Sequence, residues 1–469
     1  MRPRTLSPTG PAGAVLGINA KSSASGLNVT RIDPDTGEVV GAPRDPAATR
    51  WERFALQAAA RKLLPDSRTA KCLRLRNKGQ QIQVVKSREH KSATYKGLQT
   101  CSSVWACPVC AAKVSERRRV ELLAAITQHQ AQGGAVLLLT LTTPHYLGDD
   151  LGQVLAGQAK ALSYFNGDRA SCELFDEIKC IGKVRALEVT HGRKRAVNNG
   201  WHPHYHVLLF VASGLDLVGL RLRLHDRWFS ACARAGVKPP SLEHGVRLDD
   251  GSKAAAYASK WGLESEMTKG HTKKALDGET PFDLLRGYLA ETDKQAGALF
   301  VEFATVFKGK RQLFWSKGLK ARFGIGEVSD EELAAQEDDK GVVLGLLTVE
   351  QWRAVLRHEA RAIVLELAER GGWEAVEAYL ESISRRDQAG TSGVPEPEQV
   401  SQALPGAGVV VPRGKPGLGG DLPDWLRSLG QSGFQDGGGQ VSHRKVEVRR
   451  HVRQLAMSFG VDLQGLQVP

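Results

Sequence analysis

The segment Trp201-His202-Pro203-His204-Tyr205-His206 runs directly into the apolar stretch VLLFV at residues 207–211. A short apolar run rich in valine, leucine and phenylalanine predicts a β-strand. Residues two apart on a strand share a face, so His204 and His206 project together while Tyr205 points to the other side. Two imidazoles side by side on a rigid strand form half of a divalent-metal site. The alternative is a pair of unrelated surface histidines on an edge strand.

A neighbouring segment supplies a third candidate ligand. Residues 183–190 (KVRALEVT) predict a second strand, and the polar loop HGRKRAVNNG between the two predicts an antiparallel hairpin. Glu188 lies among apolar residues there, and a carboxylate in such surroundings needs a paired cation or a metal. His202 is the alternative third ligand, although Pro203 is expected to turn it away from the shared face. Pairing of Glu188 with Arg185 is the other alternative.

A tyrosine follows about fifty residues later, in the segment KAAAYASK of a predicted helix over 252–263. Lys253 and Lys260 lie four residues before and three after Tyr257, so both flank it on one helix face. Ammonium groups beside a phenol favour its phenolate and can also hold a phosphate. Taken alone, the segment is equally typical of an ordinary alanine-rich helix.

Together these motifs resemble the HUH family of single-strand DNA nickases, and in particular rolling-circle replication initiators of plasmids and integrative elements from high-GC Gram-positive bacteria. Three stretches carry the resemblance: LLLTLTTPH (137–145), WHPHYHVLL (201–209) and YASK (257–260). The segment from Val301 through FKGKRQLFWSKGLK resembles the end of that catalytic region. The resemblance covers about 70–325.

The resemblance implies an origin-nicking enzyme. His204, His206 and Glu188 would hold one Mg²⁺ or Mn²⁺, and Tyr257 would form a 5′-phosphotyrosyl link that leaves a 3′-OH primer. Lys260 would stabilise charge on the phosphate or the phenolate. The implied partners are double- and single-stranded origin DNA and a host helicase and polymerase, because the sequence has no G-x-x-x-x-G-K-[ST] loop of its own. Some relatives place a glutamate where Lys253 stands; Glu264 and Glu266 are possible substitutes in termination.

The cysteines predict a second metal site. Cys101, Cys107 and Cys110 form a knuckle, and Cys72 completes a set of four thiolates suited to tetrahedral Zn²⁺. His90 is a rival ligand, and ordinary free thiols are the alternative to a metal site. Cys172, Cys180 and Cys232 are expected to be scattered core thiols. An odd total of seven fits a reducing cytoplasm better than a disulfide scaffold.

The charge distribution points to a polyanion. Residues 1–135 contain 22 Lys/Arg and 9 Asp/Glu, a net +13, whereas residues 136–340 contain 28 and 27. Such a localised basic excess is typical of nucleic-acid binding, although basic surfaces also serve solubility. We expect the zinc element, with Arg117, Arg118, Arg119 and Lys253, to contact DNA; a solvated helix face is the alternative for the three arginines. Loss of zinc is expected to leave the catalytic strands in place.

The remaining sequence completes an α/β (α+β) prediction, with a central antiparallel sheet flanked by helices. Further helices are expected over 50–64, 111–132, 150–178, 216–235, from a Ser329/Glu332 capping box onward, from a Thr348/Gln351 capping box to 368, and over 373–384. A small β unit is expected between residues 69 and 100, residues 135–143 are expected to be a strand, and 298–307 are β-like. The predicted regions are a disordered segment 1–48 with a hairpin near Asp35, a basic cysteine-rich part 49–134, a catalytic domain 135–325, a helical part 326–388, a Gly/Pro-rich linker 389–440 and a basic amphipathic helix 441–469.

Two competing functions remain open at this stage. One is an HUH transposase, and the other is a non-catalytic origin-binding regulator with the same fold. No apolar run approaches the ~20 residues that span a bilayer, and the N-terminus has no apolar core of a signal peptide. The sequence therefore predicts a cytoplasmic protein.

Overall fold

The computed structural model describes residues 31–32, 39–40, 46–88, 91–195, 197–259, 278–291, 293–335 and 341–391. The chain divides into two compact units, residues 1–45 and 46–469. In the first unit, β1 (Arg31–Ile32) pairs antiparallel with β2 (Val39–Val40). This pairing confirms the hairpin expected around Asp35. The predicted linker, apart from its first residues, and the predicted tail helix lie outside the described residues.

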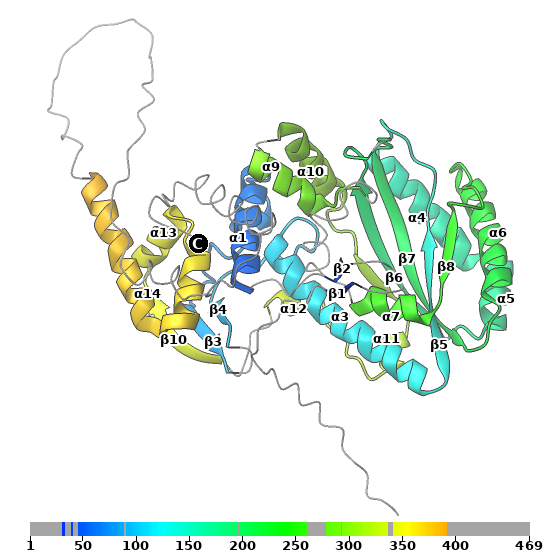
Figure 1. The fold of residues 1–469 in the computed structure, drawn as a ribbon, viewed down its shortest axis with the longest axis horizontal. Coiled ribbons are helices and arrows are strands. Elements are labelled where there is room, and N and C mark those ends of the chain that lie inside the picture. Colours follow the sequence, from blue (N-terminus) through cyan, green and yellow to red (C-terminus); the bar gives the residue numbers. More distant parts are fainter. Residues whose placement is uncertain are drawn as a thin grey trace, which may run out of the picture. The chain divides into compact units, whose positions relative to one another are not determined.

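The second unit contains a five-stranded antiparallel sheet (Figure 1). Its strand order is β8-β5-β7-β6-β9, with bounds β5 Gly134–Leu141, β6 Gly182–His191, β7 Trp201–Ala212, β8 Val246–Asp249 and β9 Leu313–Trp315. The predicted antiparallel pairing of β6 with β7 is confirmed, and Glu188 lies directly opposite His204. β9 pairs with β6, so the part of the FKGKRQLFWSKGLK segment at Leu313–Trp315 belongs to this sheet.

Alternation along β7 gives the sheet two different faces. The odd-numbered residues from Trp201 to Val211 pack into a large core with α4 (Leu151–Gly167), α6 (Leu217–Ala235) and α10 (Lys294–Val306). Leu208 and Phe210, on the even-numbered face, pack with α3 (Pro108–Ala131), α7 (Gly251–Ser259) and α11 (Leu319–Arg322). Helices therefore cover both faces, which confirms the predicted fold class.

A second sheet has three antiparallel strands in the order β10-β3-β4, from β10 (Gly341–Leu347), β3 (Ile82–Ser87) and β4 (Ala93–Lys96). α1 (Pro46–Leu63), α13 (Val349–Arg357) and α14 (Arg361–Thr391) contribute to its core. The β unit predicted between residues 69 and 100 is thus present. Its third strand comes from the far end of the described chain, so two separately predicted regions share one sheet and one core.

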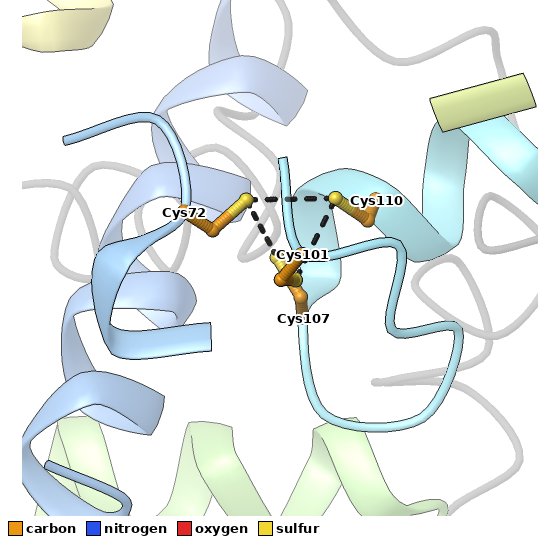
Figure 2. Close-up of side chains that lie close together, drawn as sticks. All are labelled: Cys72, Cys101, Cys107 and Cys110. Carbon is orange, nitrogen blue, oxygen red and sulfur yellow. Dashed lines mark hydrogen bonds between the residues drawn. The ribbon is translucent and has the colours of Figure 1, made fainter. Parts of the chain in front are cut away.

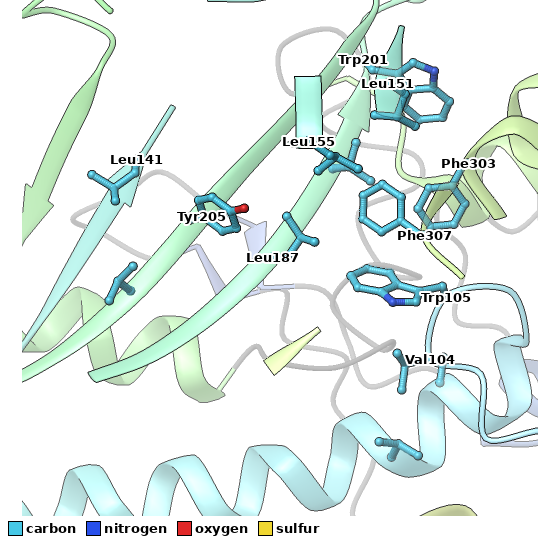
Figure 3. Close-up of a cluster of buried hydrophobic side chains, with 14 of the residues drawn as sticks. Val104, Trp105, Leu141, Leu151, Leu155, Leu187, Trp201, Tyr205, Phe303 and Phe307 are labelled. Carbon is cyan, nitrogen blue, oxygen red and sulfur yellow. The ribbon is translucent and has the colours of Figure 1, made fainter. Parts of the chain in front are cut away.

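The cysteine-rich segment is joined to the large sheet. The four cysteines belong to the same buried core as Leu141, Leu187 and Tyr205. Trp105 makes the link, because its indole Nε1 donates to the Lys310 carbonyl at 2.7 Å and its ring lies 4.7 Å from that of Phe307 (Figure 3). The expectation that the zinc element and the catalytic strands are separable is therefore not supported by the packing.

Several predicted elements need correction. Residues 298–306, expected to be β-like, belong to α10, and Phe307 is its C-cap; Phe300, Phe303 and Phe307 are fully buried at helical spacing, and an apolar run alone does not separate a buried helix from a strand. The helical sequence expected over 150–178 forms two helices, α4 and α5 (Arg169–Glu177), separated by Asp168. The long helix after Thr348 is broken by Glu359, whose φ is +48°.

Both predicted capping boxes are present. Thr348 and Gln351 exchange side-chain and backbone hydrogen bonds at the start of α13. Ser329 and Glu332 do the same at α12 (Asp330–Ala335). The remaining described helices and strands include the short helix α2 (Arg68–Lys71) and α9 (Pro281–Glu291). Among the described helices, none is long and apolar enough to cross a membrane.

Candidate active site and metal centres

Glu188, His204 and His206 meet on the even-numbered face of the large sheet. Glu188 Oε2 lies 3.6 Å from the Nε2 atoms of both histidines, and these two nitrogens are 3.2 Å apart. All three side chains are half-buried, so the group is open on one side. The strand register explains the meeting: Glu188 stands opposite His204, and His206 follows two residues later on the same face.

The other ring nitrogen of each histidine has a partner that orients the ring. His204 Nδ1 lies 3.4 Å from the His202 carbonyl oxygen. A carbonyl can only accept, so this contact is a hydrogen bond in the tautomer with the proton on Nδ1, which leaves the lone pair on Nε2. His206 Nδ1 lies 2.9 Å from the hydroxyl of Thr140, its register partner on β5. Donation from Nδ1–H to Thr140 would place the lone pair of His206 on Nε2, an arrangement typical of metal-binding histidines.

His202 requires a correction. β7 already begins at Trp201, so Pro203 does not turn His202 away, and His202 shares the face of His204 and His206. Its Nδ1 lies 3.2 Å from Nε2 of His145, and the group of potential metal ligands contains Glu188 rather than His202. Burial, followed by the neighbouring His204, lowers the pKa of His202 to about 2. His202 is thus a neutral neighbour of the three-residue group.

The helix that carries Tyr257 lies on the same side of the sheet as this group. Ala254 of α7 is fully buried against Leu138 and Leu208, which belong to the even-numbered face. Tyr257 follows Ala254 by three residues on α7. The carboxylate of Asp250 accepts hydrogen bonds from the backbone of Ser252 and Lys253 at the helix start, and the Lys253 side chain is exposed. Lys260, Glu264 and Glu266 lie outside the described residues.

The four cysteines of the predicted zinc site converge in the core (Figure 2). Cys72 follows α2, Cys101 and Cys107 lie before α3, and Cys110 is in the first turn of α3. The sulfur atoms of Cys72–Cys110, Cys101–Cys110 and Cys107–Cys72 are 3.5, 3.7 and 3.8 Å apart. Tetrahedral zinc with Zn–S bonds of about 2.3 Å requires sulfur separations of about 3.8 Å, so these four thiols fit it well.

Two buried residues support the cysteine group. Gln57 Nε2 donates to Cys107 Sγ at 3.2 Å, and the Gln57 carbonyl oxygen accepts from Arg361 at 2.6 Å. Arg361 is fully buried, so it brings a positive charge close to the thiols. Hydrogen bonds from the other thiols, Cys107 first, lower the pKa of Cys101 far below its ordinary value. His90, the rival ligand, lies outside the described residues.

Comparison with known proteins adds the family. The model of the family Rep_1, described as "Replication protein", matches residues 94–354. The chain belongs to this replication protein family. "Protein rep" of Streptomyces lividans is 28% identical over 346 residues, which cover 58% of this chain and 74% of that protein. "Neomycin resistance protein" of Streptomyces cyanogenus is 28% identical over 145 residues, 24% of this chain and 31% of that protein.

Family membership confirms the resemblance to replication proteins that the motifs indicate. No solved structure matches the chain. The replication protein match includes the large sheet, α7 and three of the four cysteines; Cys72 precedes it. Both candidate centres are therefore features of a replication protein.

Of the arginines predicted to contact DNA, Arg118 has a structural role in this replication protein. Its guanidinium donates to Glu121, to Asp330 at 2.9 Å and to the Val328 carbonyl at 2.7 Å, so it holds α3 against the segment around α12. These hydrogen bonds use guanidinium N–H groups that would otherwise bind a phosphate. Arg119 is bonded to Glu116. A DNA contact by Arg117 or Arg119 stays a prediction.

Sequence reasoning missed the residues that support the site. Thr140 lies in the quoted stretch LLLTLTTPH, but its role depends on the register that places it beside His206. Gln158 is fully buried and donates to Thr143 Oγ1 and to the Pro203 carbonyl, both at 2.8 Å. A polar residue at a core position of α4 was the signal available, since buried amides need partners. Cys172, expected in the core, is exposed.

Proposed function

We propose that the chain is a plasmid rolling-circle replication initiator of the HUH type, which nicks one strand of origin DNA. The observation that carries this proposal is the meeting of Glu188, His204 and His206 on one face of the sheet, with α7 packed on the same face. Two imidazoles and one carboxylate, open on one side, form an incomplete coordination shell that leaves room for a phosphate oxygen. Family membership supports a role in DNA replication.

The three side chains would hold Mg²⁺ or Mn²⁺. Such an ion polarises the scissile phosphate and stabilises the charge that develops on it. Donation from both Nδ1 atoms, to Thr140 and to the His202 carbonyl, would turn the lone pairs of both Nε2 atoms toward the ion. Glu188 contributes a negative charge that balances part of the ion's charge.

Tyr257 is the proposed nucleophile. Its phenolic oxygen bonds to phosphorus as the bond from phosphorus to the 3′ oxygen breaks, and a proton passes to that oxygen to give the free 3′-OH. The product is a 5′-phosphotyrosyl link, whose stored ester energy allows strands to be rejoined without an energy cofactor. Lys260 would stabilise charge on the phosphate or phenolate, and exposed Lys253 would contact the DNA backbone.

Cys72, Cys101, Cys107 and Cys110 are proposed to bind structural Zn²⁺. All four sulfurs are buried in the same core as the sheet, and their spacing fits tetrahedral zinc. The zinc would fix the start of α3 against α2 and α1. The basic excess of residues 1–135 supports a contact between this region and duplex origin DNA.

The remaining parts of the proposal follow from the chemistry. The free 3′-OH requires a polymerase, and strand separation requires a helicase, both supplied by the host cell in its cytoplasm.

The proposed catalytic domain spans 135–325, between the cysteine-rich region 49–134 and the helical region 326–388. The segments 1–48, 389–440 and 441–469 flank these regions.

The decisive experiment incubates the full-length protein with supercoiled plasmid that carries the protein's own locus, with and without Mn²⁺. We expect Mn²⁺-dependent nicking and a covalent protein–DNA adduct. Tyr257→Phe should abolish both while leaving DNA binding near normal, because only the nucleophilic oxygen is lost.

Tyr164→Phe is the matched control. Tyr164 lies on α4, against the opposite core, with Arg234 over its ring. It should nick at the normal rate. An adduct formed by the Tyr257→Phe protein would overturn the nucleophile assignment, and binding without any nicking by the unaltered protein would favour a non-catalytic regulator.

A further inference from the structure

Arg195, in the loop between β6 and β7, has no partner among the residues that the structure describes. Within the described residues, the guanidinium of Arg195 makes no hydrogen bond or ion pair, and its Nε is buried. The backbone is nevertheless fixed, because Arg195 N donates to the Gly192 carbonyl at 2.9 Å. A buried guanidinium nitrogen without an acceptor is costly, so this group is prepared for an acceptor that the described residues do not provide.

The two preceding cations, Arg193 and Lys194, differ from Arg195 because both are in ion pairs. Arg193 is bonded to Glu279 and to Asp293 at 2.6 Å, and Lys194 Nζ lies 2.9 Å from Glu279. These four charges balance one another. Arg195 therefore contributes an unbalanced positive charge at this end of the sheet.

A second unpartnered donor lies beside Arg195. Within the same described residues, the hydroxyl of Thr190 has no hydrogen bond. A β-carbon on Gly278 would lie 3.0 Å from the His191 carbonyl oxygen, 3.2 Å from Thr190 Oγ1 and 3.3 Å from Arg195 Nε, so both side chains border the small space beside this glycine. Gly278 also has φ +82°, which glycine adopts without strain.

The space lies next to the proposed metal group. Thr190 follows Glu188 by two residues on β6 and stands opposite His202. Two residues of a strand span about 6.6 Å, and both side chains lie on the metal-binding face. Arg195 lies beside Thr190 across Gly278, so the arginine borders the same surface.

We propose that Arg195 and Thr190 form a phosphate subsite, which holds the backbone phosphate next to the scissile one in single-stranded DNA. The subsite rests on the proposed nicking function and specifies how the nicking site positions single-stranded DNA. A guanidinium fork and a hydroxyl are common phosphate donors, and the unpaired charge of Arg195 matches one phosphate.

The test measures binding of fluorescein-labelled oligothymidylate of twelve nucleotides to the full-length protein in EDTA at several salt concentrations. Arg195→Gln should weaken binding about tenfold and reduce the slope of log K against log salt by about 0.7, the value for one single-strand phosphate contact. Arg195→Lys keeps the charge and should keep the slope. Thr190→Val should weaken binding about threefold, and Thr190→Ser should restore it.

Arg169→Gln is the matched control, since the exposed Arg169 of α5 is paired only with Glu173 in the described part of the chain. Its salt slope should not change. An unchanged slope for Arg195→Gln, or an equal fall for Arg169→Gln, would overturn the subsite. These measurements need no cleavage, so the subsite and the nicking function fail independently: normal nicking with an unchanged Arg195→Gln slope refutes only the subsite. If the unaltered protein does not nick DNA but the salt slope of its oligothymidylate binding still depends on Arg195, only the nicking function is refuted.

Discussion

The two groups of potential metal ligands differ in how the fold surrounds them. The four cysteine residues are 0–5% exposed and come from separate elements that pack into one core. The side chains of Glu188, His204 and His206 are 29%, 12% and 18% exposed, and they come from two paired strands. A metal in the first group would hold the fold together. A metal in the second would exchange and meet a substrate.

Their supporting contacts differ in the same direction. Gln57 of α1 contacts the cysteine group from the protein interior, and Arg361 of α14 contacts Gln57. Thr140 supports the histidines by fixing one ring nitrogen and leaves the opposite side open. We therefore expect changes in the cysteine group to alter stability, and changes in Glu188, His204 and His206 to alter cleavage.

The largest effect is expected from Cys107→Ser. Loss of one ligand should release zinc and lower the free energy of unfolding by at least about 4 kcal/mol, a fraction of the ~10–16 kcal/mol by which zinc stabilises isolated finger peptides. Zinc content by elemental analysis and denaturant unfolding measure the two effects. Because Trp105 joins this region to the sheet, single-strand cleavage should fall too. A zinc-free protein of normal stability would contradict the structural role.

His206→Ala should have the opposite profile. Mn²⁺-dependent cleavage should fall by about 10³-fold, equivalent to about 4 kcal/mol of transition-state stabilisation, while the free energy of unfolding changes by less than about 1 kcal/mol. Oligonucleotide cleavage and denaturant unfolding check both statements. The exposed His244, changed to Ala, serves as the control. A large loss of stability in His206→Ala would remove the contrast between the two sites.

Thr140→Val sharpens the comparison at a residue that binds no metal itself. Removal of the hydroxyl frees the His206 ring to rotate or change tautomer, so Mn²⁺ affinity should fall by about 10–100-fold. Titration of the protein with Mn²⁺ measures this affinity directly. Thr140→Ser keeps the hydroxyl and should restore binding; failure of the serine to do so would show that the methyl group, through packing, is what matters.

Cys172→Ser should have the smallest effect. Cys172 is exposed on α5, and its sulfur lies 3.6 Å from the Asn166 carbonyl, a contact that serine can replace. Unfolding free energy should change by less than about 0.5 kcal/mol and zinc content should stay the same. A loss of zinc here would show that the metal is bound outside the four-cysteine group.

The candidate site follows from sequence where periodicity alone decides the geometry. Alternation places His204 and His206 together, and an acidic residue within an apolar strand identifies Glu188. The position of His202 was predicted wrongly because a proline was expected to end the strand, whereas β7 extends through Pro203 to Trp201. Thr140, Arg195 and Gly278 depend on register and on loops, which local sequence patterns do not encode.

The same limit applies to the fold. The strands and the antiparallel hairpin follow from local patterns, and so do both capping boxes. The helix α10 was predicted as β-like because phenylalanine and valine favour strands, while its buried positions at helical spacing carry the true signal. The pairing of β10 with β3 joins residues about 250 positions apart, and the local sequence of neither segment indicates which strand it pairs with.

That pairing fixes an order of events during synthesis. When the ribosome has made β3 and β4, the small sheet still lacks its third strand, whereas the large sheet is complete at Trp315. At ~5–20 residues per second, β10 emerges roughly 10–50 s after its partner. During that interval β3 presents an open edge to other nascent chains. The ribosome therefore completes the large sheet before the small sheet receives its third strand.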